Sequence, residues 1–367
     1  MKLKIVIVTL LLLFQYSGFG QESEARFVDG KTADRLLEKA VEKREVTGIA
    51  AGLSIDGELR WVNGSGYRHA AQEEAFGAQT LTRIASLVKP MTAIAIMQLY
   101  EHGKIDLDVP IQQYLPDFPV KKEGDITIRH LLTHTSGTGS YASEKERNNT
   151  VHYETLSDAI AVFKDRKLLS APGTAYHYTS YGYVVLGLVI ERVSGMSYEA
   201  YMKQHIWDKA GMSHTGVETA GKEEKGKSLL YRKARNGNPV NLPPTDLSDR
   251  VPGGGVYSCV TDMIRFGNAV LNHTLIKEST LGLMLKDPGV KKGSDYGLGW
   301  TLYGNDEKHG SVFGHTGSQS GASAHLLLLP EPKITVVVLS NTSDAMKTVN
   351  HIAGALRDMA TAAVPEE

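Results

Sequence analysis

The chain has 367 residues, of which 22% are charged, and its formal net charge at pH 7 is -1. This near-neutral balance, without a basic stretch or an acidic tail, argues against a nucleic-acid partner and favours a small molecule or short peptide. The length is ample for a large core or two lobes, and the only cysteine, Cys259, has no internal disulfide partner, so packing must supply the stability.

The N-terminus has the pattern of a secretory signal peptide. Residues 1–14 combine a short basic start with an apolar run too short for a comfortable membrane span. The small residues Gly18 and Gly20 predict cleavage after Gly20, so that residues 1–20 are removed and the protein is exported, to the periplasm or outside the cell. No cysteine follows this position, which argues against a lipoprotein anchor; an uncleaved N-terminal anchor is the alternative.

The first elements after the leader are a helix and a hairpin. Residues 31–44 carry apolar side chains at helical spacing with charges on the other face, which predicts an amphipathic helix. Residues 48–55 and 58–63 read as two strands, and Asp56-Gly57 between them supplies the positive φ angles of a tight hairpin turn.

The strongest chemical signal is the pair Ser86 and Lys89, the only S-x-x-K in the chain. In a helix that begins near Ser86, these side chains lie one turn apart on the same face, so the amine can reach the hydroxyl. Residues 91–100 are apolar nearly all round, which predicts a buried helix ending at Gly103 and a desolvated lysine. Such a lysine can activate a serine nucleophile, although so short a motif is weak evidence alone.

The next segments alternate loops with short helices. Residues 105–119 read as a surface loop, and residues 125–137 as a short helix closed by a polar turn. His130 and His134 are four residues apart, but the glutamate of a zinc-protease helix is missing, so they are interpreted as capping and loop-bracing histidines and no metal site is expected.

Two later segments offer further candidate site residues. Tyr178 and Ser180 precede an apolar helical run; a tyrosine beside Lys89 could be partly ionised and act as base or proton shuttle, the alternative being a packed loop tyrosine. At residues 314–321, a strand edge rich in small residues could pair with an extended substrate, and His315 and Thr316 could hold a carboxylate; the alternative is a plain glycine-rich strand end.

The end of the chain completes a predicted α+β fold. Residues 312–317, 322–329 and 334–340 read as strands with tight connections, which implies antiparallel pairing, and residues 348–360 as a final helix. With the N-terminal hairpin they would form one antiparallel sheet flanked by the first and last helices. The alternating helices and loops up to about residue 290 predict a mainly helical lobe, with the active cleft between the two lobes.

Three segments in this order resemble the serine penicillin-recognising family, which includes penicillin-binding D,D-peptidases, class C β-lactamases and related esterases. The family signatures S-x-x-K, Y-x-N and [K/H]-T-G correspond here to Ser86-Leu-Val-Lys89, Tyr178-Thr-Ser180 and His315-Thr-Gly317. Residues 129–137, 209–215 and 252–266 add secondary matches. The likeness extends from about residue 30 to about residue 360.

The resemblance implies a β-lactamase/transpeptidase-like fold in a single catalytic domain over residues 21–367, with a sheet lobe of about 28–85 and 295–365 and a helical lobe of about 86–294. It also implies acyl transfer through Ser86, aided by Lys89 and Tyr178, with no metal and no cofactor. The backbone N–H groups of Ser86 and Ser318 would form the oxyanion hole. Ser180, His315, Thr316 and Gly317 would bind the substrate.

Two departures from the signatures shape the functional prediction. Ser180 replaces the usual asparagine and lacks its reach, and His315 replaces the lysine of class C β-lactamases. They favour a peptidase or esterase acting on small amides or esters over a β-lactamase; a catalytically silent binding protein is the third alternative. A histidine at position 315 would be partly charged near pH 7, so binding of a substrate carboxylate would strengthen on mild acidification.

Overall fold

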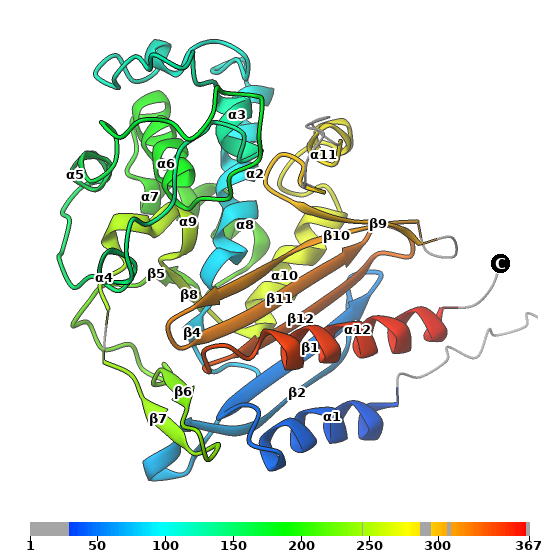
Figure 1. Ribbon diagram of the computed structural model, residues 1–367. Helices are drawn as coiled ribbons and strands as arrows, with labels where there is room; N and C mark the ends of the chain where they lie inside the picture. The colour runs from blue at the N-terminus through cyan, green and yellow to red at the C-terminus, as the bar shows by residue number, and fades with distance from the viewer. Residues whose placement is uncertain (1–28, 244, 287–294, 307–309, 365–367) are drawn as a thin grey trace, which may run out of the picture.

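The computed structural model describes residues 29–243, 245–286, 295–306 and 310–364 (Figure 1). Its largest element is a seven-stranded antiparallel sheet with helices on both faces, next to a mainly helical region. The predicted signal peptide, residues 1–20, lies outside the described residues. Within the described ranges, no helix combines the length and apolar character needed to cross a membrane.

The sheet joins the two ends of the chain, as the sequence predicts. The antiparallel pairing of β1 with β12, from Ile49 opposite Ser340 to Ile55 opposite Ile334, links the N-terminal hairpin to the C-terminal strands. Asp56 and Gly57 have φ angles of 51° and 79°, as expected for the hairpin turn between β1 and β2. In spatial order the strands are β3 (Glu74–Ala75), β2 (Glu58–His69), β1 (Gly48–Ile55), β12 (Ile334–Ser340), β11 (Ala322–Leu329), β10 (Gly310–Gln319) and β9 (Thr301–Asp306).

Two helices cover one face of the sheet and lie side by side in Figure 1: α1 (Gly30–Glu42) and α12 (Met346–Ala363). They confirm the predicted first and last helices. Their apolar stripes pack on buried strand residues, with Leu37, Val336 and Leu356 in one hydrophobic cluster. The helix α10 (Val260–Leu271) packs on the opposite face and connects the sheet to the helical region.

The helical region surrounds α2 (Val88–Glu101), whose residues 88–99 are all buried. A helix that is apolar on every side needs neighbours all round, and α6 (Tyr181–Ser194) and α9 (Val251–Gly254) are among them. The other helices are α3 (Ile128–Leu132), α4 (Glu144–Arg147), α5 (Leu156–Ala161), α7 (Tyr198–Met202), α8 (Asp208–Ala210) and α11 (Glu278–Met284).

Short turns and two small sheets complete the described chain. β4 (Thr82–Arg83), β8 (Val256–Ser258) and β5 (Gly216–Val217) form one sheet, and β6 (Tyr231–Lys233) pairs with β7 (Pro239–Asn241). The helical turns are η1 (Ala70–Gln72), η2 (Ala85–Leu87), η3 (Ile111–Gln113), η4 (Lys203–Trp207) and η5 (Ser248–Arg250). The mainly helical segment thus also carries short strands that the sequence analysis does not anticipate. The predicted lobe boundaries stay a prediction.

Candidate active site

A sharp turn presents Ser86 at the N-terminal end of the buried helix α2. Ala85 has a φ of +48°, a left-handed conformation that residues with a Cβ rarely adopt and that is common at functional sites. Ser86 follows within η2, one turn before α2. It is half-buried, whereas every other residue from Leu81 to Leu99 is buried. The chain therefore exposes one hydroxyl at the mouth of an otherwise closed core.

Lys89 lies directly beneath this hydroxyl and is fully buried. Its ammonium group donates hydrogen bonds to Ser86 Oγ at 2.9 Å, to Ser180 Oγ at 3.2 Å and to the Gly253 carbonyl oxygen at 2.8 Å. Desolvation, helped by the positive charge of Arg250, lowers the pKa of Lys89 to about 7. A large fraction of Lys89 is therefore a neutral amine near pH 7, which is the form that can take a proton from Ser86.

Tyr178 reaches the same hydroxyl from the loop before α6. Its side chain forms a hydrogen bond with Ser86, and the Lys89 ammonium lies 4.9 Å from its ring centroid. Desolvation raises the pKa of the Tyr178 phenol more than this hydrogen bond lowers it. The prediction of a partly ionised Tyr178 is therefore wrong, because burial disfavours the phenolate and the phenol keeps its proton.

The two histidines of residues 125–137 act as the sequence predicts. His130 completes the capping box of α3, since its side chain accepts a hydrogen bond from Thr127 N and its own N–H donates to Thr127 Oγ1. His134 is buried, its Nδ1 accepts from Thr179 N at 3.3 Å, and its ring centroid lies 4.3 Å from that of Tyr178. The imidazole of His134 thus supports the loop that carries Tyr178.

Ser180 and Gly253 form the wall behind Lys89. Besides accepting from Lys89, the Ser180 side chain forms a hydrogen bond with Tyr141. A Cβ on Gly253 would lie 3.0 Å from the Ser180 Cβ, so the close packing of α9 on this position favours glycine. The hydroxyl of Ser180, which stands in place of the usual asparagine, thus points toward Lys89.

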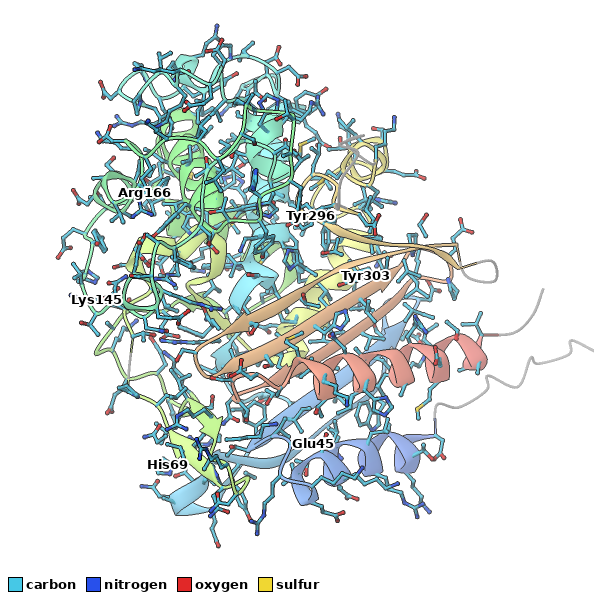
Figure 2. All side chains as sticks on the ribbon, in the orientation of Figure 1. Glu45, His69, Lys145, Arg166, Tyr296 and Tyr303 are labelled. Atoms are coloured by element: carbon cyan, nitrogen blue, oxygen red, sulfur yellow. The ribbon has the colours of Figure 1, made fainter. Side chains whose placement is uncertain are left out.

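His315 on β10 is almost completely buried, with 2% of its surface exposed. Nδ1 lies 2.6 Å from the Thr316 carbonyl oxygen, which can only accept, so Nδ1 carries the proton and Nε2 accepts from the Tyr296 hydroxyl at 2.9 Å. Burial lowers the pKa of His315 to about 3. The prediction of a partly charged His315 near pH 7 is therefore wrong, because both ring nitrogens are satisfied in the neutral form. Figure 2 shows Tyr296 between the helical region and this end of the sheet.

The end of β10 approaches the nucleophile closely. A Cβ on Gly317 would lie 2.7 Å from the Ile84 carbonyl oxygen and 3.2 Å from the Ser86 backbone nitrogen, so this approach requires glycine. β9 pairs with β10 only as far as Gly314, opposite Thr301, and so leaves residues 315–319 without β9 alongside. The sequence-predicted strand edge and the start of η2 therefore meet.

Two hollows open on either side of Ser86. One has a volume of about 380 Å³ and is lined by Ser180, the other has about 540 Å³ and is lined by His315 and Thr316. Four residues line both: Ser86, Arg147, Tyr178 and Ser318. The structure therefore brings the three sequence signatures to one place, where a carbonyl group could meet hydroxyl, amine and phenol together.

Four residues of the site have no predicted role in the sequence analysis: Arg147, Arg250, Gly253 and Tyr296. Gly253 lies in the recognised 252–266 stretch, but its contact with Lys89 spans 164 positions, and no local pattern encodes such a contact. Arg250 reaches the site with a buried partner, Asp249, at 2.6 Å. An adjacent Asp-Arg pair is too common in sequences to mark a site.

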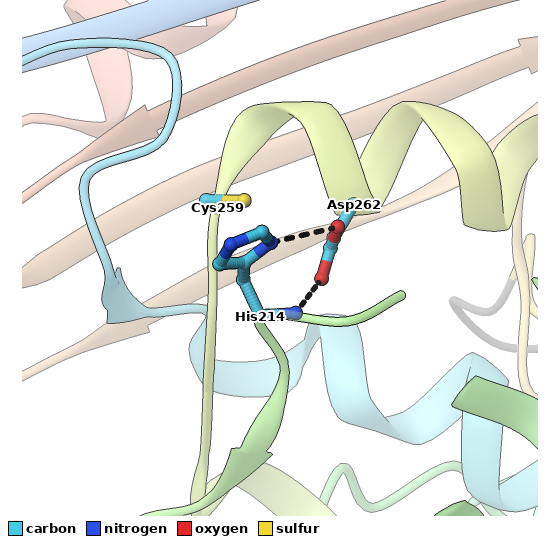
Figure 3. Close-up of side chains that lie close together, drawn as sticks. All are labelled: His214, Cys259 and Asp262. Atoms are coloured by element: carbon cyan, nitrogen blue, oxygen red, sulfur yellow. Dashed lines mark hydrogen bonds and ion pairs between the residues drawn. The ribbon is translucent and has the colours of Figure 1, made fainter. Parts of the chain in front are cut away.

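A separate cluster, His214, Cys259 and Asp262, has potential ligand atoms within 4.8 Å of one another (Figure 3). Both carboxylate oxygens of Asp262 are already engaged. Oδ1 accepts from Arg265 at 3.0 Å, and Oδ2 accepts from the backbone N–H of His214 at 2.6 Å and from the Thr215 hydroxyl at 3.0 Å. Burial raises the pKa of the Cys259 thiol, which disfavours the thiolate that a metal needs. These contacts favour a hydrogen-bonded support for the start of α10.

Known proteins resemble this chain in sequence and in fold. The human mitochondrial protein named serine beta-lactamase-like protein LACTB is 28% identical, over 81% of this chain and 71% of its own. A penicillin-binding protein from Bacillus halodurans shares the fold with a TM-score of 0.76 at 28% identity, over 87% of this chain and 98% of that one. A D-stereospecific amidohydrolase from a Streptomyces species has a TM-score of 0.74 at 26% identity, over 88% and 98%.

The fold predicted from the resemblance is thereby confirmed. The Beta-lactamase family description matches residues 33–360, nearly the whole described chain. The protein therefore belongs to the Beta-lactamase family, the serine β-lactamase and penicillin-binding-protein-like hydrolases.

Proposed function

We propose that the protein is a serine hydrolase that forms an acyl-enzyme through Ser86 and acts on small amides, peptides or esters. The observation that carries this proposal is the buried Lys89 amine, 2.9 Å from the Ser86 hydroxyl, with its pKa lowered to about 7. A base with a pKa near the working pH is the most effective proton acceptor for a serine. A binding protein has no need for so costly a buried lysine.

In acylation, the neutral Lys89 takes the Ser86 proton as Oγ attacks the substrate carbonyl carbon. The charged Lys89 can then pass this proton on to Tyr178. The Tyr178 phenol, neutral and hydrogen-bonded to Ser86, gives its proton to the departing amine or alkoxide and recovers one from the lysine. Water releases the acyl group in the second step, with the same groups acting in reverse.

The negative charge on the carbonyl oxygen would be held by the backbone N–H groups of Ser86 and Ser318. The tight contact of Gly317 with the start of η2 supports this assignment, because it brings the backbone on either side of residue 317 next to Ser86. Each such donor typically contributes a factor of ~10²–10³ to the rate. Thr316, Gly317 and Ser180 would line the path of the substrate.

Amides and esters are favoured over β-lactams as substrates because of Ser180. A hydroxyl held by Lys89 replaces the side-chain amide that would donate to and accept from a substrate amide. One of the similar proteins is by its name a D-stereospecific amidohydrolase, which supports an amide as the substrate.

A substrate panel tests the function. It contains D-amino-acid amides, peptides ending in D-Ala-D-Ala, short-chain p-nitrophenyl esters and nitrocefin. We expect turnover of an amide, peptide or ester that falls by at least about 10³-fold in Ser86→Ala. Ser213→Ala, which removes an exposed hydroxyl that lines neither hollow, should keep it. Faster turnover of nitrocefin than of the other compounds would identify a β-lactamase, and no turnover together with no covalent labelling would identify a silent binding protein.

We also propose that the protein is exported, since the first 20 residues have the composition of a cleavable signal peptide. Cell fractionation followed by N-terminal sequencing of the purified protein tests this. A mature chain that starts at Gln21 supports export with cleavage, whereas a cytoplasmic chain that starts at Met1 would contradict it.

A further inference from the structure

Residues 225–245 carry positive charge that is not balanced within this stretch. They contain five basic residues and no acidic one, although the formal net charge of the whole chain is -1. Three of the five, Arg232, Lys233 and Arg235, belong to the hairpin that β6 and β7 form, at the lower left of Figure 1. Neutral residues are interspersed among the basic ones, so the sequence shows no continuous basic run.

The fold adds a fourth cation to this hairpin. Arg44 donates to Asn238 Oδ1 at 3.0 Å, across 194 positions of the chain. A Cβ on Gly237 would lie 3.1 Å from the Arg44 Cβ, so the arginine stem packs on the hairpin turn. Arg44, Arg232 and Arg235 are exposed, and Lys233 is half-buried. These four residues form the cationic corner.

The hairpin is fixed to the rest of the protein at its base. Tyr231 is buried, its N–H donates to the Asn341 carbonyl oxygen at 2.9 Å, and its carbonyl oxygen accepts from Ser343 N at 2.8 Å. Its hydroxyl accepts from Ala70 N at 2.9 Å. Since side chains alternate along a strand, Arg232 points to the opposite side from the buried Tyr231. The positive charge is therefore held outward on an anchored backbone.

The charges of the cationic corner are unpaired. None of its four residues takes part in an ion pair with another described residue, whereas other exposed lysines do. Lys203 contacts Asp208 at 2.7 Å and Lys222 contacts Glu224 at 2.8 Å. Like charges placed close together repel one another, and an anionic partner relieves this repulsion.

We propose that the cationic corner docks the protein on a membrane surface that carries anionic lipids. Exposed cations side by side cannot enclose a small anion, but they suit a surface with many negative charges. Each lysine or arginine near such a surface strengthens binding by about fivefold. Val240, half-buried and opposite Arg232 in the hairpin, adds an apolar side chain beside the cations, a combination typical of segments that bind at a membrane interface.

The proposed export favours a lipid surface as the partner, because an exported chain emerges beside lipid headgroups and away from nucleic acid. The inference does not depend on the hydrolase function. None of the four residues lines either hollow, so vesicle binding can fail while hydrolysis stands, and the reverse.

Sedimentation of the purified protein with lipid vesicles tests this. One set of vesicles contains phosphatidylglycerol and the other contains phosphatidylcholine alone. We expect binding to the anionic vesicles at about 50 mM salt and its loss at about 500 mM, because the Debye length falls from more than about 10 Å to less than about 5 Å. The triple variant Arg232→Gln, Lys233→Gln and Arg235→Gln should bind the anionic vesicles at least about tenfold more weakly.

The matched control is a second triple variant, Lys122→Gln, Lys167→Gln and Lys209→Gln. It loses the same total charge at exposed positions outside the cationic corner. Its affinity for the anionic vesicles should stay within about twofold of wild type, because charges far from the docked surface are screened. The thermal unfolding temperature shows whether each variant is folded.

Three results would overturn the inference. The first is equal binding to both kinds of vesicle, or no binding to the anionic ones at low salt. The second is equal weakening in the two triple variants, which would show that only the overall charge matters. The third is binding of wild type to double-stranded DNA but not to anionic vesicles, which would assign the cationic corner to another polyanion.

Discussion

Removing the buried amine should make the protein inactive and, near neutral pH, more stable. Lys89 has an ordinary pKa of 10.5 and a folded pKa of about 7, so burying it opposes folding by about 4 kcal/mol at pH 7. Lys89→Met keeps the side-chain length without the amine. It also leaves the Gly253 carbonyl oxygen without its lysine donor, a loss of about 1–3 kcal/mol. We therefore expect a net stabilisation of about 2 kcal/mol at pH 7.

The pH dependence makes this prediction specific. Since the folded pKa lies below the unfolded one, the unfolded chain binds more protons between pH 7 and pH 10.5, and the wild-type protein gains stability as the pH rises through this window. The unfavourable contribution of Lys89 falls from about 4 kcal/mol at pH 7 to about 2 kcal/mol at pH 9. The advantage of Lys89→Met should shrink by the same amount.

Urea unfolding of wild type and Lys89→Met at pH 7, 8 and 9 measures this difference. Lys209→Met, which removes an exposed lysine on α8, shows the effect of losing a lysine elsewhere. A Lys89→Met protein that is less stable than wild type at pH 7, by an amount that does not change up to pH 9, would refute the reasoning. It would mean that the amine stays charged in the folded protein and cannot be the base.

Three further predictions follow from the same geometry. Because the base must be neutral, kcat/KM should rise with pH along a limb with an apparent pKa near 7, measured between pH 5.5 and 9. Gly317→Ala should slow fluorophosphonate labelling of Ser86 by about 10²–10³-fold, since its Cβ would push the end of β10 away from the nucleophile. Glu218→Ala should lower the free energy of unfolding by about 3–5 kcal/mol in urea, because it leaves the Arg83 guanidinium buried without its carboxylate.

Each of these has a control or a contrary result. An activity that is flat from pH 5.5 to 9 would contradict Lys89 as base. Gly282→Ala, at a position where a Cβ meets nothing within 4 Å, should label at the wild-type rate; equal slowing of both glycine variants would point to general loosening. Asp108→Ala breaks a solvent-exposed pair with Arg129 and should cost less than about 1 kcal/mol. If Glu218→Ala also costs less than about 1 kcal/mol, the stability of the protein does not depend on pairing the buried Arg83 with a carboxylate.

The sheet and its two covering helices are predictable because their signals are local. Asp56-Gly57 fixes the hairpin turn, and the spacing of apolar residues identifies the first and last helices without reference to the rest of the chain. The short strands inside the helical region escape prediction. A two-residue strand such as β4 has no periodic pattern of its own and exists only because β8 lies beside it.

The motif residues of the candidate site are predictable from the sequence, but its other members and its charge states are not. The three signatures give Ser86, Lys89 and Tyr178, since these residues sit in recognisable short motifs. The pKa values of the site residues depend on burial by segments that are distant in sequence. The ordinary pKa of an isolated imidazole therefore predicts a partly charged His315, whereas His315 is neutral in the folded protein. Arg147 shows the same limit, because an arginine on a short exposed helix resembles any other surface residue until the hollow that it lines together with Ser86 is known.

The central claim, that Ser86 is the nucleophile, is tested most directly by locating a covalent adduct. The protein is treated with a fluorophosphonate, digested, and mapped by mass spectrometry. The account predicts one modified peptide with the added mass on Ser86, formed faster as the pH rises through about 7, and no adduct on Ser86→Ala. An adduct on another residue, or equal labelling of wild type and Ser86→Ala, would contradict it.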